Sequence, residues 1–177
     1  MSGIRVLASP AIRAAWLELA PPFEKSSGHR LATEWAGIAD IRRRVAAGEV
    51  FDLVVSSESS MDELMQKAKI ATKTNLAKSG VGAAVRKGAP KPDISSVEAL
   101  QRALRAAKSV GYSSGPSGVY LAQLFQRLGI AAELAPKHLQ TPPGVMVGPL
   151  IATGEVELGF QQKSELLAHS DIDYVGP

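Results

Sequence analysis

Short polar residues recur at three places where a predicted strand runs into a predicted helix. These junctions hold Ser9-Pro10, Gly37-Ile38 and the stretch 114–118, which has the sequence SGPSG. A helix N-terminus presents unpaired N–H groups and a partial positive charge, so such junctions can bind an anion without Lys or Arg. The pattern predicts a site for a small anion, although ordinary helix capping explains any single junction equally well.

A second polar feature follows the apolar strand predicted near residues 158–160. There, the amides of Gln161 and Gln162 can bond a carboxylate or a carbonyl. The alternative is a hinge in which the two amides satisfy backbone groups. We expect direct ligand contact from the following residues: Ser9, Gly37, Ile38, Ser114, Gly115, Ser117, Gly118, Gln161 and Gln162.

Other chemistries lack a supporting motif. The SGPSG stretch has neither the Lys-Ser/Thr ending of a phosphate-binding P-loop nor the spacing of a dinucleotide fingerprint. The chain has no cysteine, and the spacing of His29, His138 and His169 is not that of a zinc site. No G-x-S-x-G turn marks a serine nucleophile. We therefore predict no metal and no cofactor, and we identify no catalytic residue.

The elements that must position these residues alternate between strands and helices. Hydrophobic residues make up 45% of the 177 residues but aromatic residues only 5%, so the core must come from small aliphatic side chains. This balance and the alternation predict an α/β fold with parallel-rich sheets flanked by helices. Strands are predicted over residues 4–8, 29–35, 51–56, 109–112, 158–161 and 172–175, and helices over residues 11–23, 40–47, 60–68, 97–107, 119–128, 144–153 and 164–168.

Charge and hydropathy argue against several partners. The formal net charge is only +3, and no basic stripe is interleaved with aromatic residues, so we expect no nucleic-acid partner. No apolar run approaches the roughly 20 residues that span a bilayer. The N-terminus has no charged region followed by an apolar one, so the chain is either cytoplasmic or an exported protein shown without its signal peptide.

Four stretches together resemble the molybdate-binding-like branch of the type II periplasmic solute-binding proteins. They are residues 6–9 (VLAS), 23–28 (FEKSSG), 46–54 (AAGEVFDLV) and 154–160 (GEVELGF), and a similar order and spacing runs through almost the whole chain. The resemblance implies two α/β lobes that close around a small anionic ligand in a central cleft. It also implies a periplasmic location and an ABC-type permease as partner.

The resemblance further implies a division of the chain. The first lobe would comprise residues 1–77 and 163–177, the second lobe residues 78–162, with crossovers near 76–82 and 161–164. Members of this family usually continue with a helical C-terminal segment that packs on the first lobe. Without that segment, the uncovered surface is expected to allow copies of the chain to associate.

The departures from the family pattern point to a different ligand. Ser9 matches the first ligand serine of molybdate binders, but Gly37 and its neighbours replace their second serine. Gln161 and Gln162 stand where a tyrosine is typical. The ending QQKSEL is similar to a divergent subgroup in which some members are similar to aconitate isomerase, so a small organic acid is the better expectation.

Three functional hypotheses remain open at this point. The first is a solute-binding protein that captures an organic acid for import. The second is an isomerase that moves a proton across the allylic system of an unsaturated acid, which requires a base that the sequence does not identify. The third is the effector-binding domain of a regulator, and the lack of a helix-turn-helix segment argues against a complete regulator.

Overall fold

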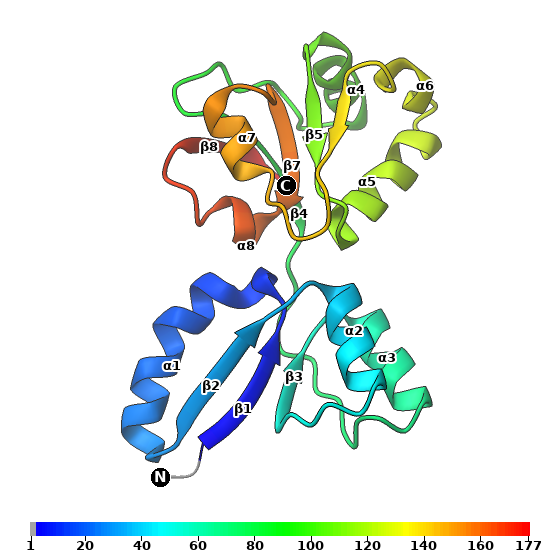
Figure 1. Ribbon diagram of the computed structural model, residues 1–177. Coiled ribbons are helices and arrows are strands. Elements are labelled where there is room, and N and C mark those ends of the chain that lie inside the picture. The colour runs from blue at the N-terminus through cyan, green and yellow to red at the C-terminus, as the bar shows by residue number, and fades with distance from the viewer. Residues whose placement is uncertain (1–2) are drawn as a thin grey trace. The chain divides into compact units, whose positions relative to one another are not determined.

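The chain forms two compact units, each with its own sheet and its own helices (Figure 1). The computed structural model describes residues 3–177, and the units are Met1–Lys78 and Ser79–Pro177. The change from one unit to the next therefore falls within the 76–82 range predicted as a crossover. The α/β class with helix-flanked sheets is confirmed.

The first unit contains a three-stranded sheet in which all strands are parallel. Its order is β2 (Arg30–Trp35), β1 (Gly3–Ala8), β3 (Leu53–Val55). The helices α2 (Ile38–Ala46) and α3 (Glu58–Gln66) lie on one side of this sheet, and α1 (Arg13–Ser27) lies on the other (Figure 1). Because the strands are parallel, all three of their carboxyl ends lie at one edge of the sheet. One buried cluster of this unit comprises Leu7, Ile41, Val45 and Leu64, and Val6 and Ala8 of β1 are also buried.

The first helix differs from its predicted bounds. A short 3-10 turn, η1 (Pro10–Ile12), comes first, and α1 (Arg13–Ser27) runs four residues beyond the predicted end at residue 23. The helix ends where Gly28 adopts the left-handed conformation, with φ of 72°. Trp16 docks α1 on β2, because its indole Nε1 donates a hydrogen bond to Thr33 Oγ1 at 3.0 Å.

The second unit contains a five-stranded mixed sheet. Its order is β6 (His138–Gln140), β5 (Val110–Tyr112), β7 (Leu158–Gln162), β4 (Val81–Arg86), β8 (Ile172–Gly176). The strands β6, β5 and β7 are parallel, whereas β4 is antiparallel to both β7 and β8. The flanking helices are α4 (Val97–Ala106), α5 (Pro116–Arg127), α6 (Ala131–Leu134), α7 (Gly148–Thr153) and α8 (Lys163–Leu166).

Two expectations differ from the structure of this unit. Residues 163–177, expected with the first lobe, belong to the second unit, because β8 completes the hydrogen bonding of β4 with Ala84 opposite Tyr174. The helix expected over residues 144–153 begins only at Gly148. The preceding loop turns at Gly144, whose φ of 82° interrupts the helix.

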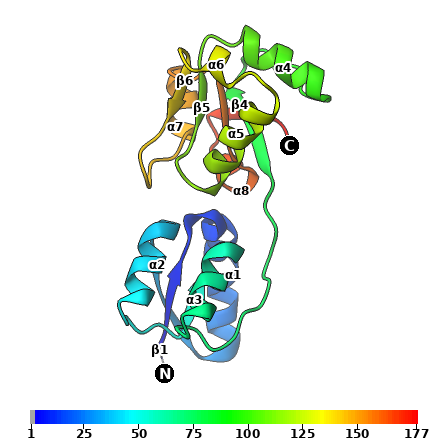
Figure 2. The same ribbon diagram turned by 90° about the vertical axis from the view of Figure 1, so that its right-hand side faces the viewer.

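The segment between α3 and β4 is extended rather than helical or paired in a sheet. Figure 2 follows this green segment as it leaves α3 and enters β4. Within residues 3–177, no helix is both long and apolar enough to cross a bilayer.

Candidate functional site

In the first unit, the junctions after all three strands lie at the same edge of the sheet, with Ser9 after β1 and Ser56 after β3, whereas Ala36 and Gly37 follow β2. The strand ends Ala8, Trp35 and Val55 are partners in the register, so the residues after them are neighbours. The backbone N–H of Ser9 donates to the carbonyl of Val55 at 2.9 Å, and Ala36 N–H donates to Ala8 at 3.1 Å. These bonds hold the three strand–helix junctions side by side.

Ser9 is the best-placed side chain of this edge in the first unit. It caps η1 as expected, because its Oγ accepts a hydrogen bond from Ala11 N–H at 3.4 Å and Pro10 follows it. The residue is only 9% exposed. A hydroxyl that accepts one bond still has its own proton to donate, so Ser9 can cap the turn and hydrogen-bond an anionic oxygen at once.

The junction at Gly37 and Ile38 offers only backbone groups. Gly37 is the N-cap of α2 and makes no side-chain capping bond, so the first N–H groups of the helix lack partners within the helix. Asp40 occupies the first turn and pairs with Arg43. A carboxylate in that position already interacts with the positive end of the helix. The N-terminus of α2 is therefore a weaker site for an added anion.

The third junction of the first unit was missed by sequence reasoning. Ser57 caps α3, with its Oγ accepting from Ser60 N–H at 3.4 Å. The hydroxyls of Ser56 and Ser60 are buried and have no hydrogen-bond partner among the described residues. The sequence signal for this junction is the Ser-Ser-Glu-Ser run directly after the apolar strand. Like Ser9, these serines stand between a strand and the helix that follows it.

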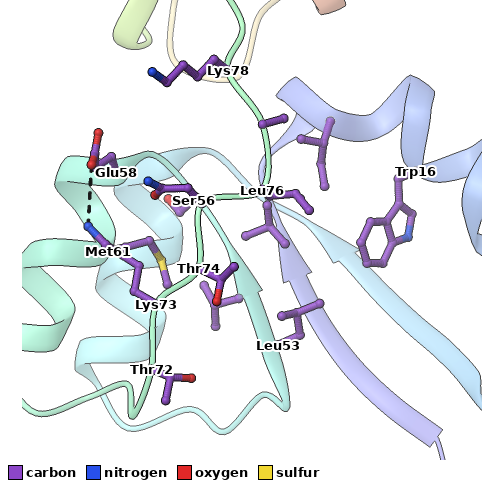
Figure 3. A pocket seen from close by; sticks show the side chains of 15 residues that line it. Trp16, Leu53, Ser56, Glu58, Met61, Thr72, Lys73, Thr74, Leu76 and Lys78 are labelled. Atoms are coloured by element: carbon purple, nitrogen blue, oxygen red, sulfur yellow. Dashed lines mark ion pairs between the residues drawn. The ribbon is translucent and has the colours of Figure 1, made fainter.

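A pocket of about 580 Å³ adjoins this junction within the first unit (Figure 3). Trp16 lies on one side of it, while Met61 and the ion pair between Lys73 and Glu58 lie on the other (Figure 3). Ser56 is part of its lining. The pocket therefore combines an apolar wall with one buried hydroxyl and two lysines, of which Lys73 pairs with Glu58 in the lining and with Asp62 outside it.

The second unit repeats the arrangement at the carboxyl edge of its parallel strands. Tyr112 pairs with Gln140 on one side and with Phe160 on the other, so the residues that follow these three positions are neighbours. All of those neighbours are polar and almost completely buried: Ser113 is 8% exposed, Thr141 1% and Gln161 2%. Buried polar groups cost free energy unless they are hydrogen-bonded, so this cluster must be held by specific contacts.

The N-terminus of α5 closes this cluster on one side. Ser117, in the first turn of the helix, is 4% exposed, and its hydroxyl lies 2.9 Å from that of Ser113. Gly115 is the N-cap, and its N–H donates to Ser113 Oγ at 3.3 Å. At Gly118 a Cβ atom would overlap the carbonyl oxygen of Ser113. Gly118 therefore has a packing role, whereas the two serines supply hydroxyl donors. Ser114 lies partly buried in the same loop.

The two glutamines have different surroundings. The Oε1 atom of Gln161 accepts a hydrogen bond from Val147 N–H at 2.8 Å, and its Nε2 lies 3.1 Å from Met146 Sδ. Gln161 thus holds the loop that leads into α7, as the hinge alternative supposed. The side-chain oxygen of Gln162 is buried and has no partner among the described residues, so Gln162 is the one with unused hydrogen-bonding capacity.

Glu165 is the further residue at this edge that sequence reasoning missed. Burial raises the pKa of the Glu165 carboxyl, and hydrogen bonds from the Gln161 side chain and the Gln162 backbone offset this only in part. Gln162 is the N-cap of α8 and Glu165 its third residue, which is the spacing of a capping box. That spacing was visible in the sequence, but the partial burial that raises the pKa of Glu165 was not.

The sequence of the chain matches one protein family and one related enzyme. Residues 4–177 match the model of the bacterial extracellular solute-binding protein family. An aconitate isomerase from Pseudomonas sp. is 39% identical over 181 residues, which covers 98% of this chain and 69% of the relative.

Solved structures with the same fold are more distant in sequence. A tungstate ABC transporter protein from Geobacter sulfurreducens has a TM-score of 0.75 at 17% identity, covering 98% of this chain and 79% of that one. The sulfate-binding protein of Mycobacterium tuberculosis has a TM-score of 0.73 at 20% identity, with 100% and 71% covered. The periplasmic molybdate-binding protein of Azotobacter vinelandii has 0.71 at 16% identity, with 90% and 71% covered. These neighbours have periplasmic-binding-protein-like folds.

Proposed function

Because this chain belongs to the bacterial extracellular solute-binding protein family, we propose that it binds a small organic acid through the carboxyl edges of its parallel strands. The observation that carries the proposal is the buried cluster at the edge of the second unit. Ser113, Ser117 and Thr141 are all nearly inaccessible yet polar, and this cluster adjoins the N-terminus of α5. Such donors suit the oxygens of an anion.

Sequence identity and the amide of Gln162 favour carboxylates over molybdate or sulfate. The relatives named for those oxyanions are at most 20% identical to this chain, whereas the 39% identical relative is named an aconitate isomerase. The amide of Gln162 adds a planar donor and acceptor pair of the kind that bonds a carboxyl group. We therefore propose an unsaturated di- or tricarboxylate of the aconitate type as the ligand.

Thermal unfolding with a panel of anions tests this proposal. A ligand at 100 times its Kd should stabilise the protein by about 2.7 kcal/mol. We expect cis- or trans-aconitate to raise the Tm and to give a binding isotherm in titration calorimetry, while molybdate, tungstate and sulfate give neither. Stabilisation by the oxyanions but not by the carboxylates would reject the proposed ligand class.

Transport is the role that the family description supports for such binding. We propose that the protein acts outside the cytoplasm and delivers its ligand to an ABC-type permease, as expected from the sequence. Cell fractionation of the source bacterium tests the location. Recovery of the native protein only with cytoplasmic markers would contradict it.

The second candidate function is an isomerase of a small unsaturated acid. The specific observation in its favour is the 39% identity to an aconitate isomerase across 98% of the chain. Proton NMR of cis- and trans-aconitate incubated with the protein tests this function. Interconversion at a rate proportional to protein concentration would support the isomerase. Binding without interconversion would reject the isomerase and leave transport as the only proposed role.

A further inference from the structure

The loop of residues 142–146, between β6 and α7, passes the carboxyl end of β5. It starts after Thr141 at the end of β6, and its far end is fixed by the hydrogen bond from Val147 N–H to Gln161 of β7. In the sheet order β6-β5-β7, β5 lies between these two anchors, and Ser113 follows its last residue. Figure 1 shows the loop curving past this end of β5 on its way to α7.

The hydroxyl donors beside this loop are closed to solvent. Ser113, Ser117 and Thr141, which we call the donor cluster, are 8%, 4% and 1% exposed. Residues 142–145 of the loop are exposed in contrast. A ligand cannot reach a hydroxyl that is 1% exposed unless the chain around it moves, so binding at the donor cluster requires that a segment of this edge opens.

The 142–146 loop is the segment whose attachments can be released. None of its residues belongs to a buried apolar cluster within residues 3–177. In that part of the chain, two side-chain hydrogen bonds tie it to the rest of the unit. Thr141 Oγ1 donates to the Val145 carbonyl at 2.7 Å, and Gln161 Nε2 lies 3.1 Å from Met146 Sδ, a weak acceptor. Segments with few buried contacts open locally at low free energy.

The bond at Thr141 also occupies a donor of the cluster. A hydroxyl has one proton to donate, and Thr141 gives it to the carbonyl of Val145 in the loop itself. A ligand carboxylate can accept this proton only after the Val145 carbonyl has moved away. The exchange favours the ligand, because a charged acceptor forms a stronger hydrogen bond than a neutral carbonyl.

We propose that the 142–146 loop is a lid over the donor cluster. The lid opens to admit a carboxylate, and a carboxylate oxygen replaces the Val145 carbonyl as the acceptor of the Thr141 hydroxyl. This inference rests on the proposed binding function. Gly144 is the position at which the closed lid can be strained selectively, because its φ is 82° and no atom lies within 4 Å of an added Cβ.

Thiol labelling measures lid opening without any ligand. The chain has no cysteine, so Ser113→Cys places a single thiol in the donor cluster. Its rate of reaction with iodoacetamide is compared alone, with Gly144→Ala and with Gly88→Ala. Gly88 is a matched control in the same unit, since its φ is 77° and an added Cβ there also meets nothing within 4 Å. We expect labelling roughly 5-fold faster with Gly144→Ala and unchanged with Gly88→Ala. If Ser113→Cys does not fold, Ser117→Cys serves as the probe.

Titration calorimetry on the variants without cysteine gives the Kd for trans-aconitate. The apparent affinity scales with the fraction of open lid, so Gly144→Ala should lower the Kd by the same factor, roughly 5-fold. Thr141→Val also releases the lid and should speed labelling of the Ser113→Cys thiol. It removes the donor for the ligand as well, so its Kd should rise roughly 5-fold. The exposed Thr153→Val is its control.

Four results would overturn the inference, wholly or in part. Equal labelling rates with Gly144→Ala and Gly88→Ala reject the lid. Faster labelling with Gly144→Ala but an unchanged Kd means that the ligand binds without lid opening, which leaves the proposed binding function intact. An unchanged or lower Kd in Thr141→Val rejects the exchange at Thr141. Wild-type protein that does not bind trans-aconitate rejects the proposed function together with the exchange, whereas the labelling rates still confirm or reject the lid.

Discussion

The hydroxyls of Ser113 and Ser117 lie 2.9 Å apart, and this contact joins the end of β5 to the first turn of α5. Both side chains are buried, at 8% and 4% exposed. Each hydroxyl is a donor and an acceptor, so a ligand oxygen can complete the pair. The contact thus connects the packing of α5 to the proposed recognition of the ligand.

Ser117→Ala should weaken ligand binding. It removes one donor and leaves Ser113 without its hydroxyl partner. We expect the Kd for trans-aconitate to rise roughly 10-fold, which equals about 1.4 kcal/mol. Titration calorimetry measures the change, with the exposed Ser170→Ala as the control in the same unit. An unchanged Kd in Ser117→Ala would exclude this serine from the binding site.

Gly118→Ala should destabilise the second unit. Its Cβ would overlap the backbone carbonyl oxygen of Ser113, and relief requires that α5 move away from β5. We expect a loss of about 3 kcal/mol in the free energy of unfolding. Urea denaturation measures it against Gly80→Ala, where no atom lies within 4 Å of the added Cβ. Equal stability of the two variants would mean that the close approach of α5 to β5 does not occur in solution.

Substitutions of Gln161 and Gln162 should affect different properties, namely stability for Gln161 and ligand binding for Gln162. Gln161→Ala leaves the N–H of Val147 without its acceptor, so we expect a stability loss of about 1–3 kcal/mol. Gln162→Ala removes an oxygen that has no partner, so it should weaken ligand binding with little change in stability. Urea denaturation and calorimetry on both variants check this. The opposite assignment of the two effects would show that Gln161, not Gln162, contacts the ligand.

Glu165→Gln should stabilise the protein at neutral pH. A folded-state pKa above the ordinary value of 4.5 means that the folded state holds the proton more tightly than the unfolded state. The stabilising contribution is complete below pH 4.5 and is lost as the pH rises through the folded-state pKa. We therefore expect Glu165→Gln to have a Tm about 2 °C higher than wild type at pH 7 and an equal Tm near pH 4. A lower Tm at pH 7 would mean that the carboxylate stabilises the fold, as an ordinary cap does.

Much of the fold followed from local patterns. The apolar strand at residues 4–8 and the cap Ser9-Pro10 were predicted because strand hydropathy and helix capping are properties of neighbouring residues. The helix α1 was predicted to end at residue 23, four residues too early, because the left-handed conformation of Gly28 is what ends it. Residues 163–177 were predicted to belong to the first lobe but belong to the second unit. The reason is that the pairing of β4 with β8 joins segments more than 80 residues apart, which local patterns do not reveal.

The candidate site was predictable only in its outline. The sequence by itself determined that serines, glycines and glutamines stand at strand–helix junctions of an α/β chain, since residue type and order are local. Only the tertiary structure decided that Ser113, Thr141 and Gln161 are neighbours, that Gln161 accepts a hydrogen bond from the Val147 N–H, and that partial burial raises the pKa of Glu165. Register, burial and hydrogen-bond partners depend on which distant segments pack together, and that packing also sets the pKa of a carboxylate.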